Sequence, residues 1–267
     1  MRKCVLTIAG SDSGAGAGIQ ADMKSMAAQG VYCLTAITAI TAQNTTAVKK
    51  VQMLDLKIIE AQIDAVMSDF PVTVVKTGML GSAEIIKLVA AKLKQYGIKK
   101  VVLDPVMVAK SGDLLLEKGA QTALLQELFP LASIITPNIP EAEVLCGRSL
   151  DGPGALKEAA RILHAAGSSA VLLKGGHAQG KRMVEDILFD GERYYYFRAP
   201  RIDTKDTHGT GCTFASAIAA HLALGRTIPL AVKAARDYLQ SILPFGLKLG
   251  HGNGPMDHFA RKGCLHV

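Results

Sequence analysis

The sequence predicts an α/β fold with a mostly parallel central sheet and helices on both of its faces. Two observations lead to this prediction. Short apolar runs rich in β-branched residues alternate along the chain with longer stretches whose apolar residues recur at helical spacing. The apolar runs also lack the polar alternation of a half-exposed strand, so we expect them to be buried on both faces, as in a parallel sheet. The repeating unit is therefore strand, crossover, helix.

The predicted elements follow in chain order. The expected parallel strands are Val5–Ala9, Leu34–Ile40, Val72–Lys76, Lys100–Leu103, Ser133–Thr136 and Ala170–Lys174. The expected helices between them are Ile19–Ala28, Leu56–Ser68, Ala83–Tyr96, Glu117–Leu128 and Pro153–Ala165. The segments Met183–Phe189 and Arg193–Phe197 flank Asp190-Gly191-Glu192 and predict a hairpin at an antiparallel edge of the sheet. Two helices close the chain, one from near Gly211 to Leu224 and one over roughly Leu230–Leu243.

Length and composition favour one domain over residues 1–267. The chain is 49% hydrophobic and 20% charged, with no Pro/Ser-rich linker or clear internal repeat. No apolar run approaches the roughly 18 residues that cross a bilayer, and the first one ends in Gly10-Ser11-Asp12 and not in a cleavage signal. Five cysteines without a CxxC pair suggest neither a disulfide framework nor a zinc site. A reducing cytoplasm fits best.

The formal net charge of +7 does not indicate a nucleic-acid binder. The Lys and Arg residues are scattered, with no basic block and no aromatic residues among the cations. A phosphate-rich small ligand or plain solubility explains the charge as well.

The first candidate motif is the glycine-rich segment Gly10–Asp22, which follows the first strand. Its glycines allow close backbone approach to a ligand, and its exit into a helix presents free N–H groups. A dinucleotide-binding loop is one alternative, although no acidic residue follows in a convincing context about 20 residues further on. A turn in which Asp12 or Asp22 is a helix cap or solvated is the other.

The second motif, Asp206–Thr213, precedes a long helix rich in small residues. Gly209 and Gly211 let consecutive backbone N–H groups turn inward, and the helix dipole adds positive charge, which favours an anion hole for a transferring phosphoryl group. The segment lacks the GxxxxGK[ST] pattern and is not a Walker-type loop, so a lysine must come from elsewhere. A glycine-rich helix cap with a buried Cys212 is the structural alternative.

Polar residues also follow several other predicted strands. In Thr136–Glu143, Asn138 and Glu141 offer hard oxygen donors for hydrated Mg²⁺, although acidic residues in a first helical turn explain the pattern equally well. The Gln43 amide, with a donor and an acceptor, can pair with the ring nitrogen and amino group of an aminopyrimidine. Lys76 or Lys174 can neutralise phosphate, and Asp104 can act near a metal. Their shared location at strand ends is typical of a ligand site.

Eight motifs, spread over nearly the whole chain, resemble those of the hydroxymethylpyrimidine/phosphomethylpyrimidine kinase family, a ribokinase-like branch that includes pyridoxal kinases. They are AGSDSGAGAGIQAD at Ala9–Asp22, AQNT at Ala42–Thr45, KTGML at Lys76–Leu80, DPVMVAKSGD at Asp104–Asp113, TPNIPEAE at Thr136–Glu143, LKGGH at Leu173–His177, DTHGTGCT at Asp206–Thr213 and GHGNGPMDHF at Gly250–Phe259.

The resemblance implies transfer of the ATP γ-phosphoryl group to 4-amino-5-hydroxymethyl-2-methylpyrimidine and then to its monophosphate, on the route to thiamine diphosphate. It also implies a homodimer and a glycine-rich lid. The residues that it assigns fall into four groups: Asp22, Gln43, Gly10, Met79 and Val106 around the pyrimidine; Lys174, Asn138 and Thr207 at the nucleotide; Glu141 and Asp104 at Mg²⁺; and Gly209, Thr210, Gly211 and Cys212 in the anion hole.

Two positions depart from related patterns. The wider superfamily usually has an Asp general base after the anion-hole glycines, where this chain has Cys212, as in the family's own branch. A thiol pKa of about 8.5 is lowered at a helix N-terminus, so Cys212 either accepts the hydroxyl proton or mainly shapes the pocket. We hypothesise that it assists the first transfer more than the second, because a phosphate nucleophile is already ionised. Ala15 replaces a glycine of many relatives, which matters only if its φ is positive.

Three rival functions remain at this point. Pyridoxal kinase activity shares the fold, nucleotide site and anion hole and differs only in the ring pocket. A non-catalytic pyrimidine sensor is expected to have lost the anion hole or the metal residues, and both are present. A nicotinamide-dependent oxidoreductase rests on the glycine pattern alone.

Overall fold

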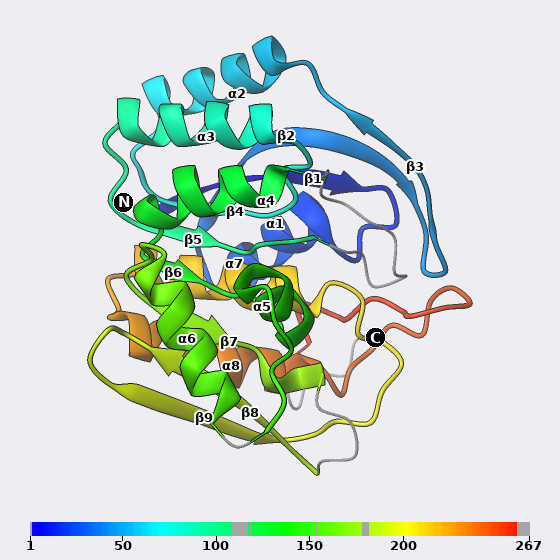
Figure 1. Cartoon of the computed structure of the whole chain (residues 1–267). Coiled ribbons are helices and arrows are strands. Elements are labelled where there is room, and N and C mark those ends of the chain that lie inside the picture. Colours follow the sequence, from blue (N-terminus) through cyan, green and yellow to red (C-terminus); the bar gives the residue numbers. More distant parts are fainter. Residues whose placement is uncertain (1, 108–116, 118, 153, 178–181, 261–267) are drawn as a thin grey trace.

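A single nine-stranded sheet organises the computed structural model, which describes residues 2–107, 117, 119–152, 154–177 and 182–260 (Figure 1). The strand order is β3-β2-β1-β4-β5-β6-β7-β8-β9. The six strands from β2 to β7 in this order are parallel, whereas β3, β8 and β9 each run antiparallel to a neighbour. The strands are β1 (Cys4–Asp12), β2 (Tyr32–Gln43), β3 (Val48–Met53), β4 (Val72–Thr77), β5 (Val101–Leu103), β6 (Ile134–Ile135), β7 (Val171–Leu173), β8 (Met183–Phe189) and β9 (Tyr194–Pro200).

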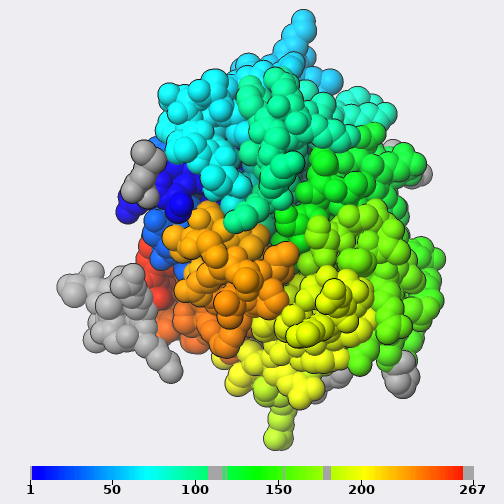
Figure 2. All heavy atoms as spheres, turned by 90° about the vertical axis from the view of Figure 1, so that its left-hand side faces the viewer, coloured from blue at the N-terminus to red at the C-terminus, as the bar shows by residue number. Residues whose placement is uncertain are grey.

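Helices cover both faces of the sheet, as predicted. Successive residues of the central strands enter opposite cores: Leu6 packs with α2, α3 and α6, while Val5 packs with α1, α7 and α8. In the space-filling view, the last two helices, in orange, form the centre of one side of the molecule (Figure 2). The helices are α1 (Gly18–Ala28), α2 (Leu56–Asp69), α3 (Ala83–Gln95), α4 (Ala120–Ala123), η1 (Leu124–Leu128), η2 (Phe129–Leu131), α5 (Ile139–Cys146), α6 (Ala155–Ala165), η3 (Gly175–His177), α7 (Thr210–Ala223) and α8 (Ile228–Ile242).

The structure differs from the prediction in three elements. Strand β3 was not predicted, because Val48–Met53 pairs with β2 along one edge only and has no apolar run. The predicted helix Glu117–Leu128 is a short α-helix continued by a π-helix. Helix α5 (Ile139–Cys146) follows the Thr136–Glu143 segment, for which the sequence indicated the start of a helix but not its extent. Three residues or segments named in the sequence analysis lie outside the described residues. They are Pro153 at the start of a predicted helix, the cysteine Cys264, and most of the Asp104–Asp113 motif.

Two structural predictions concern the chain as a whole. Among the described residues, no helix combines the length and apolar character that spanning a membrane requires. One domain over residues 1–267 stays a prediction, which a single cooperative unfolding transition would check.

Candidate active site

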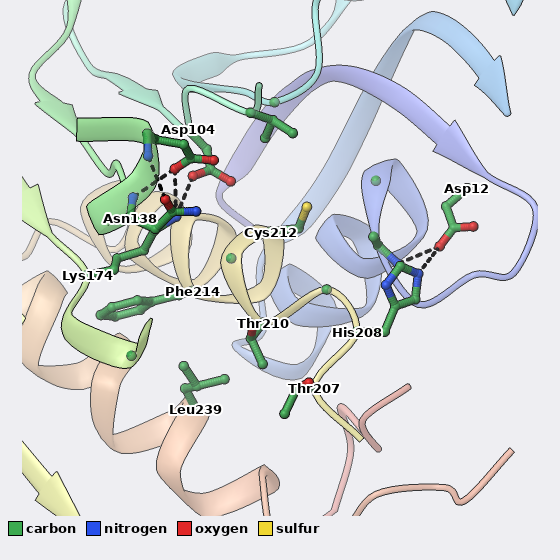
Figure 3. Close-up of a pocket in the computed structure, with 18 of the residues that line it drawn as sticks. Asp12, Asp104, Asn138, Lys174, Thr207, His208, Thr210, Cys212, Phe214 and Leu239 are labelled. Atoms are coloured by element: carbon green, nitrogen blue, oxygen red, sulfur yellow. Dashed lines mark hydrogen bonds and ion pairs between the residues drawn. The ribbon is translucent and has the colours of Figure 1, made fainter. Parts of the chain in front are cut away.

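A cavity of about 610 Å³ opens at the carboxyl ends of the parallel strands, where ligands of such sheets bind. Its lining includes residues of β1, β2, β4, β8, β9, α5, α7 and α8, together with Asp104 directly after β5 and Lys174 directly after β7. Figure 3 shows the N-terminus of α7 between an Asp12–His208 pair and a cluster around Asp104 and Lys174. Thus the predicted anion hole occupies the middle of the cavity.

The turn before α7 depends on glycine. Gly209 caps the helix with a φ of 79°, and a Cβ there would lie 1.8 Å from the Gly16 carbonyl oxygen. A Cβ on Gly211 would lie 3.4 Å from Lys174 Nζ, so this part of the helix end approaches a cation. Backbone N–H groups of a first helical turn together with a nearby ammonium favour a phosphate at this position.

The glycine-rich loop before α1 carries its own carboxylate cap. Asp12 accepts hydrogen bonds from the backbone N–H groups of Gly14, Gly16 and Ala17 at 2.8 to 3.0 Å. These three amides precede the first residue of α1, and the N-cap residue Ala17 has no side-chain cap, so Asp12 binds the loop and is not the N-cap residue of the helix. The prediction that the first turn of α1 presents free N–H groups to a ligand stays a prediction. Asp12 thus holds the loop together from within, and both ends of the loop line the cavity.

The two glycine-rich loops are locked together by His208. Its Nε2 lies 2.8 Å from Asp12 Oδ2, and a Cβ on Gly16 would lie 2.1 Å from its Cδ2. His208 belongs to the predicted motif, but nothing in the sequence indicated its partner, because Asp12 is 196 residues away. We find it in the cavity wall beside Gln43.

Asp22 lies beneath the cavity and not in its wall. Its side chain is fully buried and accepts hydrogen bonds from Thr7, Ser216 and Lys76, whose Nζ lies 2.8 and 3.0 Å from its two carboxylate oxygens. Although burial opposes a charge on Lys76, the Asp22 carboxylate raises the pKa of the ammonium. The assignment of Asp22 to the pyrimidine ring thus finds no support in the geometry, and its carboxylate is committed to Lys76.

A second charged cluster lies on the other side of α7. Lys174 Nζ lies 2.9 Å from Asp104 Oδ1 and 4.0 Å from Glu141 Oε2, and all three side chains line the cavity. Asn138 and Glu141 form a reciprocal capping box at the start of α5, with both bonds 2.8 Å long. The helix-capping alternative is therefore correct for these two residues, and it leaves the Glu141 carboxylate beside the cavity.

The charges of this cluster depend on one another. Burial raises the pKa of Glu141 to about 7, with Lys174 opposing the rise and Asp104 adding to it. Although burial also opposes ionisation of Asp104, Lys174 and Lys76 hold its pKa below the usual range. The ionised form of Glu141, beside the ionised Asp104, would be stabilised by a further cation in the cavity.

Cys212 is protonated in the resting site. Burial raises the pKa of its thiol to about 11, against the effect of Lys76 and with a further rise from the carboxylates of Asp22 and Asp104. The expected lowering at a helix N-terminus is therefore wrong here, because desolvation outweighs it.

The far end of the cavity is mainly apolar, and the sequence did not reveal it. An Arg236–Asp186 ion pair of 3.4 Å joins α8 to β8 in the lining of the cavity, with Arg236 over the Phe214 ring. The spacing of Leu239 and Leu243 on the last helix was the available signal. Its apolar residues are Val184, Pro200, Ile202, Phe214, Leu239 and Leu243.

The segment Gly250–Phe259, which we call the C-terminal strap, braces the anion hole from below. The Thr45 hydroxyl accepts hydrogen bonds from the His251 and Gly252 N–H groups, and Gly254 O accepts one from His208 N. His258 Nε2 lies 2.9 Å from Thr213 Oγ1 in the first turn of α7. The strap thus connects the end of β2 to the anion hole.

Apart from Asp22, every site residue that the sequence suggested lines this cavity. The sequence missed the roles of Thr41, His208 and the apolar end.

Comparisons with known proteins place the chain in a family. A family model described as phosphomethylpyrimidine kinase matches residues 12–257. The chain is 51% identical over 257 residues to the thiamine biosynthesis bifunctional protein ThiED of Geobacter sulfurreducens, covering 96% of this chain but only 52% of that protein, about half its length. It is 46% identical to the hydroxymethylpyrimidine/phosphomethylpyrimidine kinase of Haemophilus influenzae, covering 97% of both chains.

Solved structures agree with this result. The pyridoxal kinase of Staphylococcus aureus in complex with AMP-PCP and pyridoxal has a TM-score of 0.90 at 36% identity, over 97% of this chain and 94% of that one. The phosphomethylpyrimidine kinase of Clostridium difficile 630 has a TM-score of 0.79 at 44% identity, over 89% of this chain and 98% of that one. The chain therefore belongs to the phosphomethylpyrimidine kinase family and has its ribokinase-like fold.

Proposed function

We propose that this chain is a bifunctional kinase of thiamine biosynthesis. It transfers the γ-phosphoryl group of ATP to the hydroxymethyl group of 4-amino-5-hydroxymethyl-2-methylpyrimidine, and then a second phosphoryl group to the resulting monophosphate. The observation that carries the proposal is the position of the Gly209–Cys212 turn between His208 and the Lys174 cluster in one cavity, with the Gln43 amide beside His208. The comparisons with full-length kinase relatives support the same reaction.

In this proposal each wall of the cavity has its own task. Gln43, with Gly10, Met79 and Val106, holds the aminopyrimidine ring. The amides at the start of α7 receive the charge that develops on the transferring phosphoryl group, and Lys174 neutralises the phosphates. Asn138 and Thr207 make the other predicted contacts to the nucleotide, and the apolar end of the cavity, which was not predicted, packs against it.

The carboxylates of Asp104 and Glu141 fit Mg²⁺. This ion usually binds proteins through one or two carboxylates and completes its shell with water and substrate phosphates. Both carboxylates line the cavity, and the raised pKa of Glu141 is the property expected of a group that gains from a cation. When bound, Mg²⁺ would neutralise negative charge on the ATP phosphates, and the Lys174 ammonium would neutralise a further part of it.

The test is to incubate the purified protein with Mg-ATP and, in parallel, the pyrimidine alcohol, its monophosphate and pyridoxal, and to follow products by mass. We expect the monophosphate and the pyrophosphate to form. Exclusive phosphorylation of pyridoxal would overturn the proposed substrate but leave the kinase assignment, and no product at all would favour a pyrimidine sensor. Omission of Mg²⁺ is the metal control and should abolish transfer.

We also propose a homodimer and a cytoplasmic location. The four cysteines among the described residues, Cys4, Cys33, Cys146 and Cys212, are free, which suits a reducing compartment. Sedimentation velocity at several concentrations checks the dimer, and a single species with the mass of one chain would contradict it.

A further inference from the structure

The side-chain amide of Gln43 is held at both ends. In the structure its Oε1 lies 3.2 Å from Thr41 Oγ1, and its Nε2 lies 3.4 Å from His208 Nε2. Thr41 and Gln43 are two residues apart at the end of β2, and their side chains meet although the β2–β3 pairing is irregular between Ala42 and Gln43. A half-turn of the amide exchanges its oxygen and nitrogen, so the hydrogen bonds of the neighbours decide which orientation is stable.

Thr41 requires a hydrogen-bond donor at its end of the Gln43 amide. Its hydroxyl has one proton and lies 2.9 Å from the carbonyl oxygen of Ser11, which can only accept. That proton is therefore committed, and toward Gln43 the Thr41 oxygen can only accept a hydrogen bond. The amide atom beside Thr41 must then be the NH₂ nitrogen.

His208 requires a hydrogen-bond acceptor at the opposite end of the Gln43 amide. Its Nε2 lies 2.8 Å from the carboxylate of Asp12, which also accepts three backbone N–H groups and has no proton to donate. The His208 Nε2 therefore carries a proton, whether the ring is neutral or charged. A second N–H group beside it is unfavourable, and the amide atom there must be the oxygen.

We infer that Thr41 and His208, the latter through Asp12, are specificity-determining positioning residues that fix the Gln43 amide with Oε1 toward His208 and Nε2 toward Thr41. This inference rests on the proposed function for its substrate. Two independent neighbours therefore require the same amide orientation. It differs by a half-turn from the orientation with Oε1 at Thr41 and Nε2 at His208, which would place two N–H groups next to each other.

The orientation determines how an aminopyrimidine alcohol lies in the cavity. Along one edge of this substrate, a ring nitrogen acceptor, the 4-amino donor and the 5-hydroxymethyl group follow in that order. With Nε2 at Thr41 and Oε1 at His208, the ring nitrogen lies on the Thr41 side and the amino group on the His208 side. The hydroxymethyl group, which neighbours the amino group on the ring, then lies on the His208 side of the cavity, where the anion-hole turn begins. The opposite amide orientation would turn the hydroxymethyl group away from the anion hole.

The same orientation selects against pyridoxal. In pyridoxal the group beside the hydroxymethyl is a formyl oxygen, which accepts hydrogen bonds and would meet the Gln43 oxygen. Unpaired polar groups of this kind are the main source of discrimination between similar ligands.

The first measurement is the protonation of His208 in the free protein, by long-range ¹H–¹⁵N NMR of the imidazole nitrogens. We expect a proton on Nε2, and a ring protonated on Nδ1 alone overturns the inference. This result does not depend on any activity.

The second measurement compares Thr41→Val with Thr41→Ser by calorimetric titration with the aminopyrimidine alcohol and with its analogue that lacks the 4-amino group. We expect Thr41→Val to reduce the preference for the amino compound about tenfold, the worth of one hydrogen bond, and Thr41→Ser to keep it. Equal preferences in wild type and Thr41→Val, or equal losses in both variants, overturn the inference. If the wild-type protein binds both compounds but transfers no phosphate, the proposed function is refuted and the inference about the Gln43 amide is not.

Discussion

His208 Nε2 lies 2.8 Å from Asp12 Oδ2, which makes one carboxylate the common partner of the glycine-rich loop and of the anion-hole turn. We expect Asp12→Asn to lower the free energy of unfolding by about 2 kcal/mol, because a buried charged acceptor loses several bonds. Urea unfolding measures this change. The exposed Asp237→Asn is the control and should have almost no effect.

Asp12 also predicts a pH dependence. Burial opposes its ionisation, but the His208 contact and the Ala17 and Gly14 N–H groups hold its pKa below the usual value. A lowered folded-state pKa contributes stability above the unfolded value of about 3.9 and loses it as the pH falls further. The stability difference between wild type and Asp12→Asn should therefore shrink below about pH 4. A constant difference down to pH 2 would contradict this explanation.

Ala15 has a φ of 58°, a left-handed conformation that disfavours a side chain. Ala15→Gly should raise the free energy of unfolding by about 1 kcal/mol, since glycine adopts this φ without strain. The matched control is Ala17→Gly at a φ of −129°, which relieves no strain and should not stabilise the protein. Thermal unfolding of the two variants decides, and equal effects would disprove the argument.

The Lys76–Asp22 pair predicts strong coupling between two substitutions. Lys76→Met leaves the fully buried Asp22 carboxylate without a cation and should cost about 3–5 kcal/mol of stability. The double variant Lys76→Met/Asp22→Asn removes both charges and should recover more than half of that loss. A double-mutant cycle by urea unfolding measures the coupling, and additive effects would mean that the pair is not an energetic unit.

Glu141 predicts the opposite pH trend to Asp12. Its folded-state pKa of about 7 exceeds the unfolded value near 4.3, so the unfolded chain loses this proton first and stability falls between pH 4 and 7. Glu141→Gln should be more stable than wild type by about 2 kcal/mol at pH 8 and equal to it near pH 4. The same variant should need more Mg²⁺ for half-maximal activity. Equal stability at pH 8 would disprove the titration.

Cys212 predicts different pH profiles for the two transfers. If its thiolate accepts the hydroxyl proton, a pKa of about 11 makes the first rate rise about tenfold per pH unit from pH 7 to 10. The second transfer should lack this slope, because a phosphate nucleophile is already ionised. Cys212→Ser should remove the slope and slow the first transfer more than the second. Equal impairment of both would leave Cys212 only a role in shaping the cavity.

The sequence predicted the parallel strands because their apolar runs are continuous, and it predicted the cavity wall because polar residues follow those runs. Asp22 shows what was missed. It lies at helical spacing from Ile19 and Met26, both buried, so its carboxylate belongs to the buried stripe of α1. A carboxylate at such a position requires a buried cation, and Lys76 in an apolar strand is that cation. The spacing contained this signal, and the ligand-binding interpretation overlooked it.

The role of His208 could not be predicted in the same way. Its partner Asp12 and its neighbour Gln43 come from two other strand ends, and only the three-dimensional fold joins them. Strand β3 was missed for a related reason, since its pairing with β2 depends on an edge that the local sequence does not describe.

The C-terminal strap has a consequence for how the protein is made. Gly254 bonds to His208, and His258 lies against Thr213, so the anion hole is complete only when these late residues are in place. During translation, β1 and the glycine-rich loop leave the ribosome before the strap and must wait for more than two hundred further residues. At about 5–20 residues per second, the first half of the site exists for ten seconds or more before its other half is synthesised. Chains released before residue 258 should carry the sheet but no working kinase.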